Sequence, residues 1–232
     1  PSKNTAIASG RARVQDEGSQ IAALALSRVR PVEAGESWLD MCAGPGGKAA
    51  LLAAEALVGG ATLTANELVP ARAKLVRNAL AVFEAPPEVW EKDGVEIGEE
   101  HPEQFDRILL DAPCTGLGAL RRRPEARWRK QPGDVAQLGA IQTALLKSAL
   151  KALKPGGVLA YVTCSPHAAE TKAIVGSVLR KVEGVTKIDT PAVIQGFAKT
   201  ELDLPDATHV QLWPHRHGTD AMFIQLLVKA DA

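Results

Sequence analysis

The chain has 232 residues, a length that suits one α/β domain with a small appendage. Apolar residues make up 46% of it and aromatic residues only 4%, which favours helices packed on a parallel sheet and argues against a β-sandwich. Lysine plus arginine and aspartate plus glutamate are equal at 27 each, so net charge selects no class of partner.

No apolar run is long enough to span a bilayer, and the polar, basic first thirty residues have no signal-peptide pattern. Three widely spaced cysteines argue against a disulfide framework. We therefore expect a reduced, cytoplasmic protein with no membrane partner. Because the chain begins at Pro1 and not at Met, we expect a fragment or a processed product.

Apolar periodicity and turn residues predict helices and strands that alternate along the chain. In chain order they are a helix at 14–30, a strand at 37–41, a helix to about 57, a strand at 61–66, a helix at 71–83, strands at 89–90 and 105–110, a helix at 134–153, a strand at 158–163, a helix at 168–182 and a strand at 222–228. This alternation predicts an α/β fold with a doubly wound, mostly parallel sheet. We expect its last strand to run antiparallel.

Five chemically capable residues fall at or just after the ends of predicted strands: Asp40, Glu67, Asp93, Asp111 and Cys164. Ligands of such sheets bind outside the carboxyl ends of the strands. These residues are therefore expected to line one edge of the sheet and to share a site.

A glycine-rich turn, Asp40-Met-Cys-Ala-Gly-Pro-Gly-Gly-Lys48, follows the first strand, and Glu67 ends the second. The turn lacks the Walker A spacing and matches GxGxxG imperfectly. Taken alone, the turn is more simply a tight turn and Glu67 a solvated carboxylate. Together they favour an adenosine-containing cofactor, for which S-adenosylmethionine (SAM) and NAD are the candidates.

Two further segments place cysteines at the ends of strands expected to be neighbours. The first reads Asp111-Ala-Pro-Cys-Thr-Gly-Leu-Gly118 and the second Thr163-Cys164-Ser165-Pro166. Each cysteine alone is more often a small core residue than a catalytic one. Two of the chain's three cysteines at neighbouring strand ends favour a shared chemical role.

DMCAGPGGK, DAPCTGLG and VTCSP resemble motifs I, IV and VI of the RNA 5-methylcytosine methyltransferases, and most closely the bacterial RsmB (Fmu/Sun) branch, which modifies small-subunit ribosomal RNA. The resemblance extends to QDEGSQ at 15–20, to the arginine-rich stretch after the fourth motif and to PHRHGTD at 214–220, and so covers nearly the whole chain. Gly44 replaces the usual Ala, Thr115 the usual Ser, and Ala221-Met222 the usual Gly-Phe. None of these changes removes a group that the chemistry needs.

The resemblance implies a Rossmann-like class I SAM-dependent methyltransferase, with a catalytic domain at 31–232 and an N-terminal extension at 1–30. It implies SAM as cofactor, RNA as partner, small-subunit (16S) ribosomal RNA above all, and a monomer is favoured. The helical RNA-binding domain that precedes the catalytic domain in this branch is not in the sequence.

The resemblance also implies the roles of individual residues. Cys164 attacks carbon-6 of the cytosine, Asp111 contacts the Watson–Crick edge and protonates nitrogen-3, and Cys114 serves in release of the product. Glu67 binds the ribose hydroxyls and Asp93 the adenine amino group. The methionine part of SAM is expected along the turn formed by Cys42, Ala43, Gly44, Pro45, Gly46, Gly47 and Lys48, with Asp111 also beside the cofactor.

The basic segment, residues 121–130, reads RRRPEARWRK. We expect phosphate contacts and base stacking here, although a solvated charged loop is a serious alternative. The residues concerned are Arg121, Arg122, Arg123, Arg127, Trp128, Arg129 and Lys130. His209, His215 and His217 lack convincing zinc spacing, and no metal is expected.

Three rival functions remain open at this level. A methyltransferase for another acceptor needs an NPPY-type fourth motif or a nucleophile confined to the Pro-Cys motif, and neither pattern fits. An NAD-dependent oxidoreductase is weakened by the missing GxGxxG. A non-catalytic SAM- or RNA-binding module is disfavoured by the presence of both Cys114 and Cys164.

Overall fold

The computed structural model describes residues 4–231, which fold around one mixed sheet. Its strands are β1 (Ser37–Asp40), β2 (Thr62–Asn66), β3 (Glu88–Trp90), β4 (Phe105–Asp111), β5 (Leu153–Thr163), β6 (Val185–Lys187), β7 (Val210–Gln211) and β8 (Phe223–Lys229). The helices are α1 (Thr5–Ala8), α2 (Glu17–Ser27), α3 (Gly47–Gly59), α4 (Pro70–Leu80), α5 (Ile97–Glu100), α6 (Ala126–Arg129), α7 (Pro132–Ala152), α8 (Lys172–Leu179), α9 (Thr190–Phe197) and α10 (Pro214–His217).

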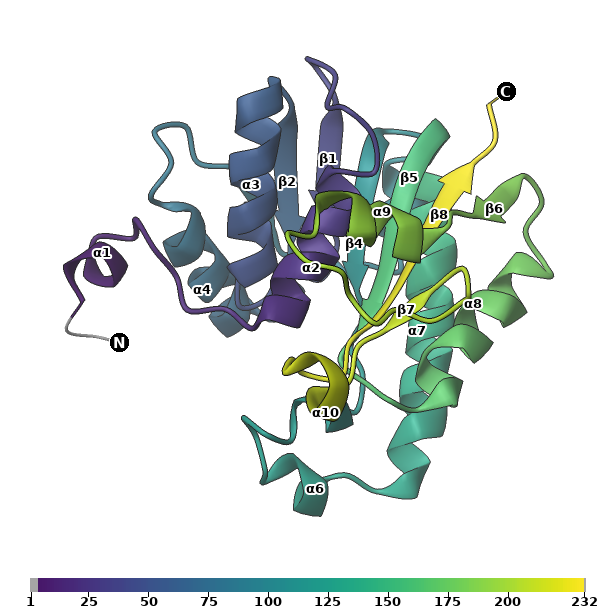
Figure 1. Cartoon of the computed structure of the whole chain (residues 1–232). Coiled ribbons are helices and arrows are strands. Elements are labelled where there is room, and N and C mark those ends of the chain that lie inside the picture. The colour runs from purple at the N-terminus through teal and green to yellow at the C-terminus, as the bar shows by residue number, and fades with distance from the viewer. Residues whose placement is uncertain (1–3, 232) are drawn as a thin grey trace.

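The strands follow the order β3-β2-β1-β4-β5-β8-β6, and β7 pairs with β8 beside this path. The five strands from β3 to β5 are parallel, whereas β8 runs antiparallel to β5 (Figure 1). This confirms the predicted doubly wound sheet with an antiparallel last strand. The order places β1, β4 and β5 side by side, so the residues at their carboxyl ends are neighbours.

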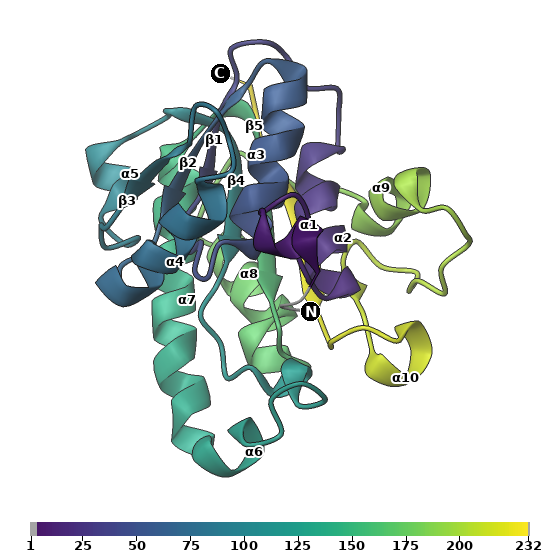
Figure 2. The same cartoon turned by 90° about the vertical axis from the view of Figure 1, so that its left-hand side faces the viewer.

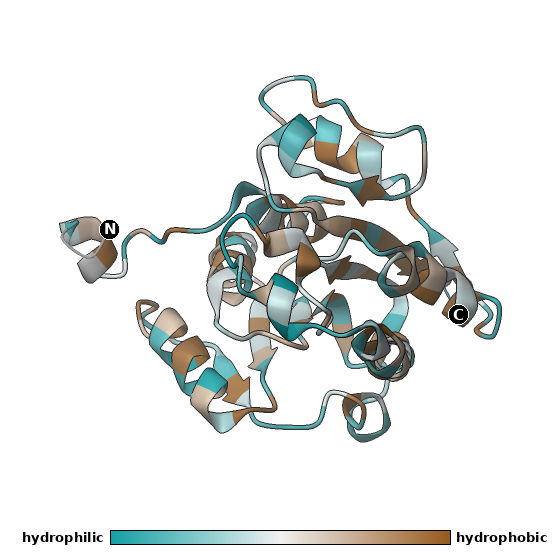
Figure 3. Cartoon of the chain, turned by 90° about the horizontal axis from the view of Figure 1, so that it is seen from below, coloured by the Kyte–Doolittle hydropathy of each residue, from teal (hydrophilic) through white to brown (hydrophobic). Residues whose placement is uncertain are grey.

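Helices cover both faces of the sheet. Helices α2, α3, α4 and α9 share one apolar core with one face, and α5, α7 and α8 share a second core with the other (Figures 1 and 2). Seen from the side of α6 and α10, the apolar strands lie between these two layers (Figure 3). Within residues 4–231, no helix is both long and apolar enough to cross a membrane.

Helix α2, which lies before residue 31, is joined to the sheet through the buried Arg107 of β4. The Arg107 guanidinium donates to the carbonyl oxygens of Ser27 at 2.7 Å and Pro31 at 2.8 Å. It also pairs with Glu36 at 2.8 Å. Carbonyls at a helix C-terminus otherwise lack partners, so this side chain both caps α2 and holds it against the sheet.

The structure differs from the predicted elements in several places, and the four-residue helices α1, α5 and α6 were not predicted at all. Strand β5 begins at Leu153, because Leu153 pairs with Phe105 before an irregularity in the ladder, so Lys154–Gly157 lies within the strand and not in a loop. The helix predicted at 168–182 is broken at Thr171, whose φ of −125° and ψ of −113° are not helical. In the tail, β6, α9, β7 and α10 were not predicted, because elements of two to eight residues show too little periodicity.

Candidate active site

The carboxyl ends of β1, β4 and β5 bring predicted site residues together. Asp40 ends β1, Asp111 ends β4, and Cys164 follows the last residue of β5. The register pairs Asp40 with Leu109, and Asp111 with Val162. These three side chains therefore start from adjacent strands at the same edge of the sheet.

The glycine-rich turn bends tightly over the ends of β1 and β2. Gly46 has a φ of +98°, and a Cβ there would lie 2.5 Å from the Cβ of Ala79. Only glycine fits this left-handed, crowded position without strain. The backbone N–H of Gly44 donates to a carboxylate oxygen of Glu67 at 3.1 Å, and Val69 donates to the other at 3.0 Å. The turn and Glu67 thus form one unit, as the sequence predicted.

Asp40 is the least satisfied polar group of this region. The residue is fully buried, and neither carboxylate oxygen has a hydrogen-bond partner in the part of the chain described. Burial first, and then the negative charge of Asp111, raise the pKa of Asp40 to about 8. Buried carboxylates normally have partners, so this group has the properties of one that receives a cationic ligand.

Lys48 and Asp111 form an ion pair at the centre of the site. The Lys48 Nζ lies 2.8 Å from an Asp111 carboxylate oxygen and 3.4 Å from the Ser19 hydroxyl of α2. Burial lowers the pKa of Lys48, but the charge and hydrogen bond of Asp111, together with the charge of Asp40, outweigh it, and the net pKa is raised. Lys48 is therefore cationic at neutral pH, and its ammonium group contacts the Asp111 carboxylate.

The two cysteines predicted to act together are in contact. The Sγ atoms of Cys114 and Cys164 lie 3.4 Å apart. The hydrogen bond from the Cys114 thiol lowers the pKa of Cys164 and raises that of Cys114. Burial and the negative charge of Asp111 raise the pKa of Cys164, and the positive charge of Lys48 lowers it, but the hydrogen bond with Cys114 is the largest effect. Cys164 is therefore the more readily ionised of the two thiols.

The backbone beside Cys164 is held by the end of the fourth motif. The N–H of Gly118 donates to the carbonyl oxygen of Cys164 at 2.9 Å, and the N–H of Ala221 donates to the carbonyl of Gly118 at 2.9 Å. A Cβ on Gly118 would lie 2.7 Å from the Cys164 oxygen and would also clash with the Ala221 oxygen. Only glycine allows these three segments to pack so closely.

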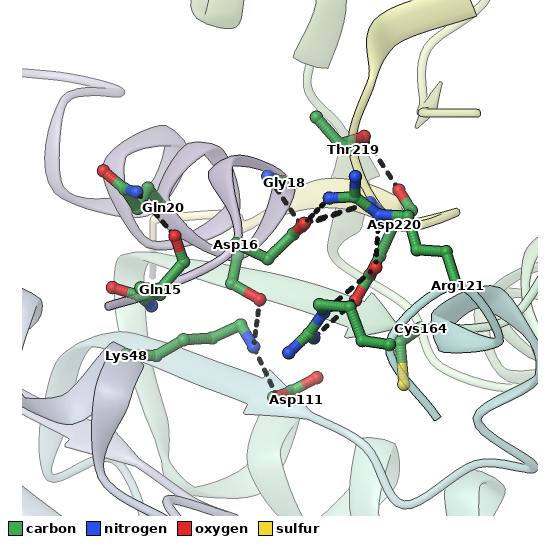
Figure 4. A network of polar contacts seen from close by, with 12 residues as sticks. Gln15, Asp16, Gly18, Gln20, Lys48, Asp111, Arg121, Cys164, Thr219 and Asp220 are labelled. Carbon is green, nitrogen blue, oxygen red and sulfur yellow. Dashed lines mark hydrogen bonds and ion pairs between the residues drawn. The ribbon is translucent and has the colours of Figure 1, made fainter. Parts of the chain in front are cut away.

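Two carboxylates far apart in sequence bind the start of the basic segment (Figure 4). Asp16 accepts from the backbone N–H of Asp220 at 3.2 Å and pairs with Arg121. Asp220 pairs with Arg121 at 3.0 Å and with Arg122 at 2.5 Å. Both carboxylate side chains are only 1% exposed. The network joins the N-terminal segment, the start of the basic segment and the C-terminal tail above the site.

The remainder of the basic segment faces solvent. Arg123, Arg127 and Arg129 are exposed, and none of them forms an ion pair with a residue in the 4–231 range. The Trp128 side chain is 78% exposed, and the Arg127 guanidinium lies 5.3 Å from its ring centroid. The segment predicted as one surface is therefore divided into a paired start and a free end.

Asp93 is the predicted site residue that the structure connects least to the others. Its carboxylate accepts from the backbone N–H of Val95 at 3.0 Å, and the side chain is exposed. A residue absent from the predictions, Asn66, supports this region. Its buried amide donates to the carbonyl oxygens of Met41 at 3.0 Å and of Lys92 at 3.1 Å, so it ties the ends of β1 and β3 together. A polar residue at the end of a buried strand is the signal that could have identified it.

Glu170 is the second residue that the sequence did not reveal. Its side chain is completely buried and accepts hydrogen bonds from Thr115 and Ser165, each of which follows one of the paired cysteines. Across the described part of the chain, no three His, Cys, Asp or Glu residues are grouped as metal ligands.

Comparison with known proteins places this chain in a family. A sequence profile of the 16S rRNA methyltransferases RsmB/F matches residues 28–228. A Mycobacterium tuberculosis protein named as a methyltransferase is 50% identical over 228 residues, which cover 98% of this chain and 48% of that protein. The ribosomal RNA small subunit methyltransferase B of Shewanella oneidensis is 34% identical over 223 residues, or 95% of this chain and 48% of that enzyme.

The fold agrees with solved structures as well. The structure of NSun6 from Pyrococcus horikoshii matches with a TM-score of 0.83 at 24% identity, over 100% of this chain and 56% of that one. The chain spans about half the length of the curated relatives that it matches. Since the profile covers most of the sequence and these relatives match nearly all of it, the chain belongs to the RsmB/F family of 16S rRNA methyltransferases, whose members use SAM.

Proposed function

We propose that this chain binds SAM and transfers its methyl group to carbon-5 of a cytosine in small-subunit ribosomal RNA, through a covalent bond between Cys164 and carbon-6. The single observation that carries this proposal is the contact between two thiols, 3.4 Å apart, beside the Lys48–Asp111 pair. A methyltransferase for an ordinary amine or hydroxyl acceptor has no need of paired thiols at this position.

The residues around the glycine-rich turn fit SAM. Asp40 offers a buried carboxylate whose two side-chain oxygens lack partners among residues 4–231, which suits the ammonium group of a methionine moiety. Glu67 is held at the turn and keeps acceptor capacity for ribose hydroxyls, since a carboxylate has about four lone-pair sites. Asp93, exposed beyond β3, is assigned to the adenine amino group. When bound, SAM supplies an electrophilic methyl group on a sulfonium.

The need for covalent catalysis follows from the weak nucleophilicity of carbon-5 in cytosine. The Cys164 thiolate forms a bond to carbon-6, and the electron pair of the ring double bond becomes available at carbon-5. Cys164 is suited to this role because the Cys114 thiol donates to it and the Lys48 charge stabilises its ionised form. The ring becomes more basic at nitrogen-3 as this bond forms.

Lys48 and Asp111 together match the polar edge of cytosine. Asp111, as a carboxylate, accepts from the exocyclic amino group, while the Lys48 ammonium donates toward the ring acceptors. In this proposal Lys48 supplies the proton for nitrogen-3 and Asp111 anchors the amino group. This division of roles differs from the one expected from the sequence, in which Asp111 is also the acid.

Product release requires loss of the carbon-5 proton and cleavage of the bond between carbon-6 and the Cys164 sulfur. In this proposal Cys114 loses its own proton to water once Cys164 is bonded to carbon-6, and then takes the carbon-5 proton as a thiolate. The electrons of the carbon-5–hydrogen bond reform the ring double bond, Cys164 leaves as a thiolate, and nitrogen-3 returns its proton to Lys48. The free end of the basic segment, Arg123–Lys130, is proposed to contact RNA phosphates, with Trp128 stacking on a base.

The decisive experiment compares two cysteine variants with a ribosomal RNA fragment and SAM. Cys164→Ala is expected to give neither 5-methylcytosine nor an RNA adduct, because no other thiolate reaches carbon-6. Cys114→Ala is expected to methylate once and then stall as a protein–RNA complex that survives denaturing electrophoresis. Cys42→Ala changes a thiol of the SAM turn that is not in the pair, so it is expected to trap no adduct even where SAM binding is weakened.

Swapped results, with the adduct in Cys164→Ala, would assign the nucleophile to the fourth motif. Full turnover in both variants would remove the covalent mechanism. Mass mapping of the methylated RNA identifies the base and the atom, so methylation at another position would contradict the choice of cytosine carbon-5.

A further inference from the structure

Glu170 is a buried carboxylate that the proposed mechanism leaves without a role. Its relative exposure is 0%, and it lies at the end of the short 3₁₀ turn Ala168–Glu170, just before the break at Thr171. Among residues 4–231, no lysine, arginine or histidine pairs with it. A buried charge is costly unless other hydrogen bonds compensate for it, so its neutral partners need an explanation.

All the partners of this carboxylate come from the segments that carry the two thiols or support them. One oxygen accepts from the Thr115 backbone N–H at 2.8 Å, and the other from the Thr115 hydroxyl at 2.6 Å. The Ser165 hydroxyl donates to the second oxygen at 2.6 Å. The Gln142 amide of α7 donates to Glu170 at 3.4 Å and to the Pro113 carbonyl at 2.9 Å.

These contacts span both sides of the thiol pair. Thr115 directly follows Cys114 and Ser165 directly follows Cys164, so one carboxylate bridges the two loops one residue beyond each sulfur. The backbone of Glu170 is held in place as well, since its carbonyl oxygen accepts from the Tyr161 hydroxyl at 3.0 Å. Charge-assisted hydrogen bonds of this kind are short and strong, as the 2.6 Å distances indicate.

We propose that Glu170 is a positioning residue for methyl transfer, whose carboxylate holds the loops of Cys114 and Cys164 together so that the two sulfurs stay in contact. The inference rests on the proposed function of the two thiols. Without this bridge the two loops stay joined only through their backbones, by the Gly118–Cys164 and Ala112–Val162 hydrogen bonds, while Gln142 still holds the Pro113 carbonyl, as far as the described residues show. The distance between the sulfurs would then vary, and Cys114 would serve product release less efficiently.

The test measures the contact between the thiols directly, without RNA or SAM. Dibromobimane fluoresces when it bridges two neighbouring thiols, and a Cys114→Ser variant supplies the background signal. Glu170→Gln is expected to lower the bridging rate by about tenfold, because the reaction depends on holding both sulfurs within reach of one reagent. The pH profile of Cys164 alkylation by iodoacetamide is expected to move to higher pH, because the Cys114 donor is displaced.

A matched control separates this role from a loss of stability. Glu36 is also a buried glutamate, but it lies at the opposite end of β1 and pairs with Arg107. Glu36→Gln is expected to lower stability while leaving both the bridging rate and the alkylation profile as in the unmodified chain. With RNA and SAM, Glu170→Gln is expected to accumulate the covalent adduct, as Cys114→Ala does, and Glu36→Gln is not.

Two smaller changes keep the proposal open to refutation if Glu170→Gln does not fold. Thr115→Val and Ser165→Ala each remove one hydroxyl from the bridge and are expected to slow bridging about threefold, the effect of one hydrogen bond. Wild-type bridging and an unshifted alkylation profile in the folded variants would overturn the positioning role and leave the proposed function intact. Methylation by Cys164→Ala would instead overturn the proposed function, while the bridging comparison would keep its meaning.

Discussion

The cofactor half and the thiol half of the strand-end site differ in how their polar groups are satisfied. In the cofactor half, Asp40 is buried with two oxygens that have no partner among the described residues, and Asp93 contacts only its own turn. In the thiol half, Cys114 and Cys164 contact each other, and Glu170 accepts from both of their loops. In the cofactor half, polar groups are left without partners, whereas in the thiol half they already bond to one another.

This difference teaches which half changes least during the proposed reaction. Groups that bond to one another before substrate arrives need little reorganisation, and this favours chemistry at the thiols. Polar groups left without partners favour binding, because a ligand can form the hydrogen bonds that the folded chain does not provide. Four predictions test this contrast, beginning with the largest expected effect.

The pH dependence of stability should expose the unsatisfied carboxylate. The pKa of Asp40 is about 8 in the folded chain, against about 3.9 when unfolded, so the folded state holds an extra proton between these values. The contribution of Asp40 to the free energy of unfolding is therefore greatest below about pH 4, and it is lost as the pH rises through this window. From about pH 5 to about pH 8, the free energy of unfolding should fall by about 2–4 kcal/mol more than in Asp40→Asn.

Urea unfolding at several pH values measures this difference, and equal slopes in both proteins would show that Asp40 does not titrate there. The same logic predicts that SAM binding releases a proton from Asp40, because an ammonium ligand favours the carboxylate. Calorimetry in buffers of different ionisation enthalpy should detect this release in the unmodified chain and not in Asp40→Asn.

The second prediction concerns the carboxylate network above the thiol half. Arg122→Gln should lower the free energy of unfolding by about 1–3 kcal/mol, because it leaves the buried Asp220 with weaker compensation. The neighbouring Arg123→Gln, which removes an exposed charge of the same type, should change stability by no more than about 0.5 kcal/mol. Denaturant unfolding of both variants measures these two free energies. Similar losses in both would mean that the pairing of Arg122 with Asp220 does not contribute to stability.

The third prediction concerns Glu67, which accepts from the turn and which we propose to bind the ribose of SAM. Glu67→Ala should weaken SAM binding by about 1–3 kcal/mol, because the backbone N–H of Gly44 and the ribose hydroxyls lose their acceptor. Glu88→Ala, an exposed change on β3, should leave the affinity unaltered. Calorimetry on the folded variants measures both, and an unchanged affinity in Glu67→Ala would remove this residue from the site.

The smallest expected effect belongs to the free end of the basic segment. Replacing Arg123, Arg127 and Arg129 by Gln should reduce the slope of log K against log salt by about 0.7–0.9 for each phosphate that the protein no longer neutralises. SAM affinity should stay the same. Filter binding of RNA at several salt concentrations gives the slope, and an unaltered slope would make this segment a solvated loop.

The sequence was sufficient to predict the sheet and most of the site because these features depend on local patterns. Glycines after a strand and acidic residues at strand ends were enough to identify the turn, Glu67 and Asp111. The pairing of Cys114 with Cys164 followed from the expectation that their strands are neighbours. Each prediction needed only the order of elements along the chain.

The groups that were missed depend on contacts between distant segments. Asp16 and Asp220 are 204 residues apart, and no local pattern announces that one accepts from the other. Glu170 lies in a segment predicted as a regular helix, and its inward direction follows from the break at Thr171. The paired role of Arg121 was hidden for the same reason, since an arginine-rich run looks equally suited to phosphates and to buried carboxylates.

The cap that Arg107 places on α2 has a consequence for how the molecule opens. One buried guanidinium joins the end of this helix to a central strand. If the helix detached, the Arg107 guanidinium would lose its carbonyl partners while its charge remained in the core, which is costly. In native-state hydrogen exchange, the amides of α2 should therefore exchange with the same opening free energy as those of β4, as parts of one cooperative unit. Residues 17–30 would then open only together with the central sheet, and the edge of the sheet that carries the two thiols would be held by the N-terminal helix as well as by the C-terminal tail.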